Sequence, residues 1–385
     1  MQIRSLKPWI TMPSKICLVS NTSWSFLRFR ADVIKSLLNA GHEVVLLAPA
    51  DEHTGQLAKL GARIILLRSL SRKGLNPFDD LMLYREFFRI YTLEKPDLVF
   101  QYTIKPNIYS TLAAKRLGIP TVAAITGLGY AFINKGMVTL MARQLYRLAL
   151  RSAGEVWFLN QDDFRYFVEN KLVDRAKARQ IPGEGINCTD TFNPARVVAP
   201  DSETVNFLFI GRLLFDKGVA EYVAAARRIR ERYPYAEFRM LGYLNVDNPT
   251  AVQRDQLEEW VKEGTITYLG AVDDVRPVIA ACDCVVLPSY REGMSTTLQE
   301  SAAMGKALVA SNIAGCKELV DDGETGFLCE VADVDSLTQS LERILKLSPA
   351  ERREMGGRGR EKMIKEYSVD RVISLYHQTI AEMTS

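Results

Sequence analysis

Two glutamates, Glu292 and Glu300, are separated by seven residues in the stretch PSYREGMSTTLQESAAM. The apolar run 284–287 before them predicts a buried strand, and residues 297–304 are good helix formers. The first carboxylate is therefore expected in a strand-to-helix turn. The second is expected about a turn and a half into the helix. This spacing predicts two carboxylates beside one helix start.

The predicted helix start offers an anion site between these carboxylates. The backbone amides of Met294, Ser295 and Thr296 fall there, where unpaired N–H groups and the helix dipole favour negative charge. Carboxylates accept hydrogen bonds from hydroxyl groups. The combination suits a ligand that is part sugar and part phosphate.

A second motif, GRLLFDKG at 211–218, follows the apolar run NFLFI and opens a predicted helix. Gly211 allows close approach of the backbone to a ligand. Arg212 offers a rigid fork of donors and Lys217 a point charge for phosphate oxygens. Such a pair alone is often ordinary surface. Together with Glu292 and Glu300 it predicts a convergent anion site.

Strands alternate with helices along both halves of the chain, with glycine after several helices, which predicts βαβ units and parallel sheets. In the first half the predicted strands are 15–20, 42–49, 62–67, 97–102 and 120–125, and the helices 29–39, 57–60, 79–93 and 107–117. In the second half the strands are 206–211, 236–242, 265–270, 282–287, 307–311 and 325–328, and the helices 219–232 and 254–263.

The α/β pattern predicts two Rossmann-like, doubly wound domains with a ligand cleft between them. Length also favours two domains, since 385 residues exceed one typical core. The polar, proline-containing stretch 183–205 interrupts the pattern. The expected parts are an extension (1–14), a first domain (15–186), a linker (187–205), a second domain (206–366) and a final helix segment (367–385) that can return to the first domain.

Charge is distributed unevenly although the net charge is only +3. Residues 1–185 carry 26 Lys and Arg against 15 Asp and Glu, whereas the rest carries 23 against 31. The basic first half is expected to meet an anionic partner.

The six cysteines are scattered without a CxxC pair or a histidine cluster, and we expect buried, reduced thiols rather than a metal site. No apolar run reaches the ~20 residues that span a bilayer, and residues 1–15 lack the apolar segment of a signal peptide. A cytoplasmic location is expected.

Several stretches resemble family 4 glycosyltransferases. In the second half these are VNFLFIGRLLFDKGVAEYV, ITYLGAVDDVRPVIAACDCVVLPS and REGMSTTLQESAAMGKALVASNIAGCKELVDDGETGFL, and AGHEVVLLAP lies in the first half. The resemblance implies the GT-B fold, with two Rossmann-like domains and an interdomain cleft. It also implies sugar transfer from a nucleotide donor with retention of anomeric configuration, and no metal ion or other cofactor.

The resemblance assigns roles to the residues of both motifs. Arg212 and Lys217 match the pair that holds the donor diphosphate, and the amides of Met294, Ser295 and Thr296 match its helix-start donors. Glu292 matches the carboxylate that faces the donor sugar, and Glu300 the one that binds the ribose. Because no metal is implied, the cations and amides would stabilise charge on the leaving diphosphate. A role of Glu292 as nucleophile stays open.

The first half resembles a narrower subgroup through LSRKGLNPFDDL, TIKPNIYSTLAAKRLGIP and ITGLGYAF. This subgroup extends undecaprenyl-diphosphate-linked sugars for bacterial O-antigen, capsule or protein glycans, and N-acetylgalactosaminyltransferases are the favoured match. The resemblance implies a UDP-sugar donor and a polyprenyl-diphosphate-linked acceptor. The expected acceptor residues are Thr22, Arg28, Lys105 and Thr126.

This chain departs from the family pattern at two places. The loop after the first strand reads SNTSWSFLRFR without glycine, so that Thr22 and Ser23 stand where many members have small glycines. Thr126 stands where many members have a histidine, and His42, His53 and His377 lie elsewhere. We therefore hypothesise that the leaving phosphate itself takes the proton of the acceptor hydroxyl.

The stretch 134–151 predicts a helix with Arg143, Arg147 and Arg151 on one stripe. A basic stripe of this kind is typical of a helix at an anionic membrane surface. Arg68, Arg72 and Lys73 would add to it. The alternative is a helix of the first domain that packs on its sheet and has a solvated basic face. The expectation is peripheral association with the inner membrane through the first domain.

Two other functions are alternatives to sugar transfer. A UDP-N-acetylglucosamine 2-epimerase shares the two-domain fold but needs no acceptor. A nucleic-acid-binding protein would use the basic half, but no basic–aromatic motif accompanies the charge. The donor sugar, the acceptor glycan, the linkage and the oligomeric state are left open by the sequence.

Overall fold

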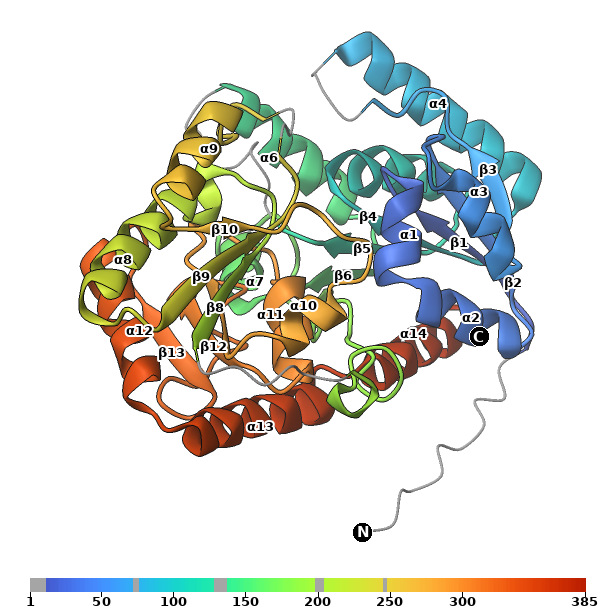
Figure 1. Cartoon of the computed structure of the whole chain (residues 1–385). Coiled ribbons are helices and arrows are strands. Elements are labelled where there is room, and N and C mark those ends of the chain that lie inside the picture. Colours follow the sequence, from blue (N-terminus) through green and yellow to red (C-terminus); the bar gives the residue numbers. More distant parts are fainter. Residues whose placement is uncertain (1–11, 72–75, 128–136, 198–203, 245–247) are drawn as a thin grey trace. The chain divides into compact units, whose positions relative to one another are not determined.

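The computed structural model describes residues 12–71, 76–127, 137–197, 204–244 and 248–385. The chain divides into two compact units, each built on a parallel sheet flanked by helices (Figure 1). The first unit comprises Met1–Gly185 and Val369–Ser385, and the second Ile186–Ser368. The predicted fold class of two doubly wound α/β domains is confirmed. Residues 187–205, for which we expected a linker, are assigned to the second unit.

The sheet of the first unit has the strand order β3-β2-β1-β4-β5-β6-β7, with parallel neighbours throughout. The strands are β1 (Lys15–Val19), β2 (Glu43–Ala48), β3 (Arg63–Leu66), β4 (Leu98–Tyr102), β5 (Thr121–Ile125), β6 (Glu155–Phe158) and β7 (Ala178–Gln180). The five strands predicted in the first half are confirmed. The strands β6 and β7, which are short, were not predicted.

The helices of this unit connect those strands. They are α1 (Ser23–Phe29), α2 (Ala31–Asn39), α3 (Thr54–Leu57) with the short turn η1 (Ala58–Leu60), α4 (Pro77–Glu94), the π-turn η2 (Pro106–Ser110), α5 (Thr111–Arg116), α6 (Met137–Leu150), α7 (Gln161–Glu169) and α14 (Val369–Met383). The helix α7 was not predicted. The helix expected over 29–39 is α2, which begins two residues later and ends at the predicted residue. Helix α1 was not predicted, and it is separated from α2 by Arg30, whose φ of −130° is not helical.

The break at Arg30 places a guanidinium in the interior of the unit. Arg30 is 2% exposed, lies 3.5 Å from the centre of the Tyr102 ring and pairs with Glu184. A buried charge needs a partner and a π-face or hydrogen bonds to replace water. These contacts explain why the chain leaves helical geometry at Arg30, between α1 and α2.

Helix α4 shows how the helices cover the sheet. Asn76 accepts a hydrogen bond from Phe78 N at its start and Pro77 occupies the first turn, so the local sequence specifies the N-terminus. Leu83, Phe87 and Tyr91 are fully buried in a core that includes residues of β1, β2 and β4. The side of α4 that faces the sheet is therefore buried in the core, and this burial stabilises the helix.

The C-terminal helix α14 belongs to the first unit and packs against α2. Figure 1 shows this red helix beside the blue α2. Tyr376 and Tyr102 share a hydroxyl–hydroxyl hydrogen bond of 2.6 Å, and Nε2 of His377 lies 2.9 Å from the Ser36 hydroxyl. His42 lies beside His377, with 6.1 Å between the ring centres.

This histidine pair predicts loss of stability in acid. Burial lowers the pKa of His42 and, together with the neighbouring His42, that of His377. Because the unfolded chain then binds more protons than the folded one, stability is full above the ordinary histidine pKa and falls as the pH drops below it. Thermal melts at pH 7.5 and 5.5 should show a smaller acid loss in His377→Gln, whose amide can keep the Ser36 contact. An equal loss in both proteins would contradict this.

The sheet of the second unit has the order β10-β9-β8-β11-β12-β13, again with parallel neighbours. The strands are β8 (Val205–Ile210), β9 (Ala236–Leu241), β10 (Thr267–Tyr268), β11 (Cys284–Leu287), β12 (Ala307–Ser311) and β13 (Gly326–Cys329). The helices are α8 (Val219–Arg232), α9 (Arg254–Lys262), α10 (Arg276–Ala280), α11 (Thr296–Ala303), α12 (Val334–Lys346) and α13 (Pro349–Glu366), with the turn η5 (Phe215–Lys217). All six predicted strands are present, while α12 and α13 were not predicted.

All six cysteines are buried and unbridged, as expected. Among the described residues, no group of three or more His, Cys, Asp or Glu side chains is arranged to hold a metal ion. No helix in the described ranges is long and apolar enough to cross a membrane.

Candidate active site

The two sequence motifs meet at one point of the second sheet. Strands β8 and β11 are neighbours, although β9 and β10 separate them in the chain, so the strand order reverses between them. Ligands of doubly wound sheets bind outside the carboxyl ends of the strands at such a reversal. Gly211 follows β8 and Pro288 follows β11, which places both motifs there.

Glycines allow the loops at this point to approach each other closely. Gly218 has φ +75°, and a Cβ atom there would lie 2.0 Å from the carbonyl oxygen of Pro288. Tyr290 N donates to the carbonyl oxygen of Asp216 at 2.9 Å. The GRLLFDKG loop and the two-glutamate loop are therefore held together by their backbones.

Lys217 and Glu292 are brought into direct contact by this arrangement. The Nζ atom of Lys217 lies 2.6 Å from Oε1 of Glu292, and their side chains are only 16% and 14% exposed. The sequence separates them by 75 positions. Such a partly buried pair is less screened than a surface ion pair. It places a cation and a carboxylate side by side at the strand-order reversal.

Arg212 is the exposed cation of the site. The side chains of Leu213 and Leu214, which follow it, are buried and fix the loop. Within the described part of the chain, the Arg212 guanidinium has no hydrogen-bond or ion-pair partner and remains available for a ligand.

The start of α11 differs in one respect from the expectation. Ser295 is the N-cap, and its hydroxyl accepts a hydrogen bond from Leu298 N at 3.3 Å. Its own amide donates to the carbonyl oxygen of Gly315 at 2.9 Å. The expectation that Ser295 N is free for an anion is therefore wrong, because the loop after β12 uses it. Among the described residues, Met294 N and Thr296 N make no such bond.

Glu300 lies in the second turn of α11 and is 4% exposed. Its neighbour Gln299 is 1% exposed. A carboxylate so deeply placed is held rigidly by the helix, and it requires polar partners. Its position a helical turn beyond the anion site agrees with the predicted spacing.

Gly315 and Cys316 also belong to the site, although no role was predicted for them. Gly315 has φ +78°, and a Cβ atom there would lie 2.8 Å from Gly293 O and 2.9 Å from Glu292 O. Its amide donates to Glu318 Oε2 at 2.7 Å. Burial, and next the Glu292 carboxylate, raise the pKa of the Cys316 thiol well above its usual value. The glycine in NIAGCKELV was the available signal, since only glycine fits such a close approach.

The candidate acceptor residues follow strands of the first unit, at the carboxyl edge of its sheet. Thr22 follows β1 and caps α1, accepting from Ser25 N at 3.2 Å. Lys105 follows β4, where the strand order also reverses, and its Nζ atom lies 2.9 Å from Oδ1 of Asp80 in α4. Thr126 follows β5, and Arg28 is exposed in the last turn of α1. The ITGLGYAF motif continues beyond Gly127 into residues 128–132, outside the described ranges.

Two arginines of the predicted basic stripe have protein partners. Arg143 donates to Asn170 Oδ1 at 2.7 Å, and Arg147 donates to the carbonyl oxygens of Lys171 and Asn170 at 3.2 and 3.1 Å. These groups lie at the C-terminal end of α7, where cations are favourable. Both side chains are therefore half-buried against the end of α7, and neither the membrane-facing stripe nor the solvated basic face of the alternative describes them. Arg151 remains exposed, while Arg72 and Lys73 lie outside the described residues.

The comparisons with known proteins agree with this fold. A family model described as glycosyl transferases group 1 matches residues 204–347, and one described as glycosyl transferase 4-like matches residues 15–160. The N,N'-diacetylbacillosaminyl-diphospho-undecaprenol alpha-1,3-N-acetylgalactosaminyltransferase of Campylobacter jejuni is 30% identical over 86% of this chain and 89% of its own length. The UDP-Gal:alpha-D-GlcNAc-diphosphoundecaprenol alpha-1,3-galactosyltransferase of Escherichia coli is 25% identical, over 71% and 72%.

Solved structures show the same fold. A glycosyltransferase from Rickettsia africae has a TM-score of 0.81 at 21% identity and covers 97% of this chain and 99% of its own. HepE from Anabaena, solved in complex with UDP, has a TM-score of 0.79 at 16% identity, over 96% and 100%. The chain therefore belongs to the group 1, type 4-like glycosyltransferases and has their GT-B fold.

Proposed function

We propose that this enzyme transfers an N-acetylhexosamine, with N-acetylgalactosamine favoured, from a UDP-sugar to an undecaprenyl-diphosphate-linked saccharide. Both relatives described above act on undecaprenyl-diphosphate-linked sugars by name, and one transfers N-acetylgalactosamine. The observation that carries the proposal is the contact of Lys217 with Glu292 beside Arg212 at the strand-order reversal. A cation–carboxylate pair there suits a diphosphate joined to a sugar.

Each site residue takes one part of the donor in this proposal. Arg212, Lys217 and the amides of Met294 and Thr296 bind the diphosphate and stabilise the charge that develops as it leaves. Glu292 hydrogen-bonds to hydroxyl groups of the transferred sugar, and Glu300 binds the ribose. The bond from the sugar's anomeric carbon to the diphosphate breaks, and a bond to the acceptor oxygen forms on the same face. No metal ion is required, since the protein supplies the positive charge.

The acceptor proton passes to an oxygen of the leaving diphosphate. Two of the three histidines, His42 and His377, favour this route because both are buried beside α14 and not at the sheet edge that carries Thr126. His53 follows β2 at the carboxyl edge, and its ring lies 3.4 Å from Glu52. UDP then leaves carrying that proton. Isotope effects at the phosphate oxygens of the donor would report the proton transfer, and their absence would argue against it.

We further propose peripheral association with the cytoplasmic face of the inner membrane, where a polyprenyl-linked acceptor is held. The excess of basic residues in the first half supports an anionic surface as the partner.

The decisive test measures sugar transfer from each of a panel of UDP-sugars to a short polyprenyl-diphosphate-linked saccharide. The products are identified by NMR. We expect one UDP-N-acetylhexosamine to be used preferentially, with retained configuration and unchanged rate in a metal chelator. A reaction mixture without acceptor is the control. An isomerised UDP-sugar in that control, or no transfer from any donor, would contradict the proposal.

A further inference from the structure

The outward face of α4 combines exposed apolar side chains with arginines. Phe78, Leu81, Met82, Arg85 and Arg89 follow the three- and four-residue spacing that places side chains on one helix face. Phe78 is 67%, Leu81 44% and Met82 39% exposed. The opposite face already fills the core, so folding does not require these apolar groups. Clustered exposed apolar side chains are typical of interaction surfaces.

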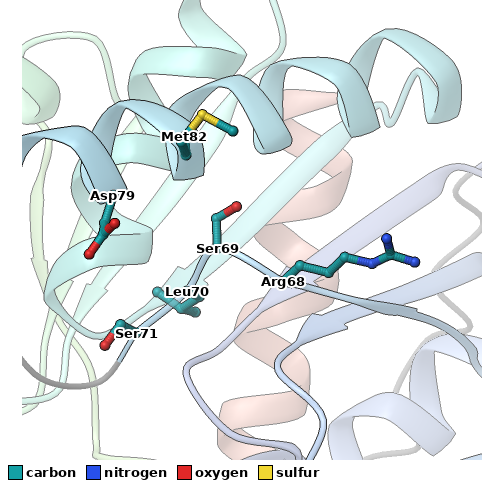
Figure 2. Close-up of a pocket in the computed structure, with 6 residues that line it drawn as sticks. All are labelled: Arg68, Ser69, Leu70, Ser71, Asp79 and Met82. Carbon is teal, nitrogen blue, oxygen red and sulfur yellow. The ribbon is translucent and has the colours of Figure 1, made fainter.

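A hollow of about 390 Å³ borders this face (Figure 2). The loop after β3 forms one wall, and Met82 and Asp79 of α4 form the other, as Figure 2 shows. The amides of Arg68 and Ser69 both donate to the Glu86 carboxylate at 2.8 Å, which fixes the loop against α4. Leu66, at the end of β3, adds a further apolar group that is 45% exposed.

The cations of this region are available to a partner. Within the described residues, the guanidinium groups of Arg68, Arg85 and Arg89 have no hydrogen-bond or ion-pair partner. This distinguishes them from Arg143 and Arg147, which bind the end of α7.

The acidic side chains nearby offset only part of this charge. Asp80 is bound to Lys105 and to the hydroxyl of Tyr109, whereas Glu86 binds neutral backbone amides and keeps its negative charge. In the first turn of α4, whose residues are all described, Asp79 is the exposed carboxylate. Together, Glu86 and Asp79 leave one net positive charge from the three arginines. This surface is thus apolar near the start of α4 and carries net positive charge further along the helix and on the loop after β3. Such a surface complements an anionic lipid leaflet.

We propose that the outward face of α4, together with Leu66 and Arg68, docks on an anionic lipid bilayer. Phe78, Leu81 and Met82 enter the boundary between headgroups and acyl chains, while Arg68, Arg85 and Arg89 bind lipid phosphates. The inference rests on the proposed function for the identity of the membrane. The helix α4 begins at the carboxyl edge of the parallel sheet, and Asp80 in its first turn binds the candidate acceptor residue Lys105. Docking would therefore hold the acceptor loop at the lipid surface.

Flotation with vesicles of equal parts phosphatidylglycerol and phosphatidylcholine tests the assignment with the full-length chain. We expect Phe78→Ser/Leu81→Ser to reduce vesicle binding about tenfold or more. Arg85→Gln/Arg89→Gln should weaken it about fivefold per arginine, and only at low salt. The matched control is Val261→Ser/Ile364→Ser, which changes similarly exposed apolar side chains of the second unit and should leave binding intact.

Transfer to a water-soluble short-chain acceptor separates this inference from the proposed function. It should be the same in the α4 variants and the unaltered protein, whereas transfer to a full-length lipid acceptor in vesicles should slow in the α4 variants alone. Vesicle binding that survives the α4 changes, or is lost instead with Leu140→Ser/Leu148→Ser on α6, would overturn the docking face while leaving the transferase function standing. Lack of binding by the unaltered protein would also overturn it. Absence of transfer to either acceptor would instead count against the proposed function.

Discussion

Replacing Lys217 with alanine is expected to lower kcat about a hundredfold or more. The substitution removes a cation that stabilises charge on the leaving diphosphate, and loss of one such group typically costs about 3 kcal/mol of transition-state stabilisation. It also leaves the Glu292 carboxylate, only 14% exposed, without its partner. Arg212→Ala should reduce kcat only through the loss of positive charge at the leaving diphosphate, because it leaves no carboxylate of the described residues without a partner. Steady-state kinetics with the preferred UDP-sugar measure both.

A second ion pair in the same unit provides the control. Lys362 lies 2.6 Å from Asp321, the same separation as Lys217 and Glu292, and its side chain is 11% exposed. Lys362→Ala removes a comparable contact away from the proposed donor site and should keep the unaltered kcat. Full activity in both Arg212→Ala and Lys217→Ala would show that the donor site is assigned wrongly.

Glu300→Gln provides the complementary comparison, because its proposed partner is the ribose and not the reacting group. It should raise KM for the donor with little change in kcat, which is the pattern of lost ground-state binding.

Gly218→Ala is expected to lower the free energy of unfolding by about 4 kcal/mol or more. At φ +75° an alanine already costs about 1–2 kcal/mol. In addition, its Cβ atom would lie 2.0 Å from Pro288 O, a backbone atom that a side-chain rotation cannot move away. The loops that carry Lys217 and Glu292 must then separate, so activity should fall together with stability. Chemical denaturation and kinetics on the same preparation measure the two effects.

Substitution of Gly264 separates the cost of the left-handed backbone angle from the cost of the close contact with Pro288. It has nearly the same backbone angle, φ +73°, but nothing lies within 4 Å of the position of its Cβ atom. Gly264→Ala should therefore cost only about 1–2 kcal/mol and keep full activity. If the two alanine variants are equally stable, the close approach of the loops is not what Gly218 provides.

Local signals in the sequence were sufficient for most elements of the fold. Alternating apolar runs and helix-forming segments predicted α8 and β12 with the bounds that the structure has, because each depends on its own residues. Short strands such as β7, with three residues, carried too little pattern to be found. The break at Arg30 between α1 and α2 was also missed, because its cause is a buried contact with Tyr102 and Glu184, far away in sequence.

For the candidate site as well, some features follow from the local sequence and others only from the fold. The sequence by itself determined the types of side chain and their places after strands: a rigid cation fork at Arg212, a point charge at Lys217, and carboxylates at Glu292 and Glu300. Residue type and local spacing are properties of short segments, so these features can be read without the fold.

Only the tertiary structure decided which of these groups touch. The pairing of β8 with β11 brings Lys217 to Glu292 across 75 positions, and the loop after β12 places Gly315 beneath Glu292 and takes the Ser295 amide. It also turned Arg143 and Arg147 toward α7 and left the arginines of α4 exposed. These outcomes depend on long-range packing, in which the partner of a polar group is set by the elements that lie beside it and not by its neighbours in sequence.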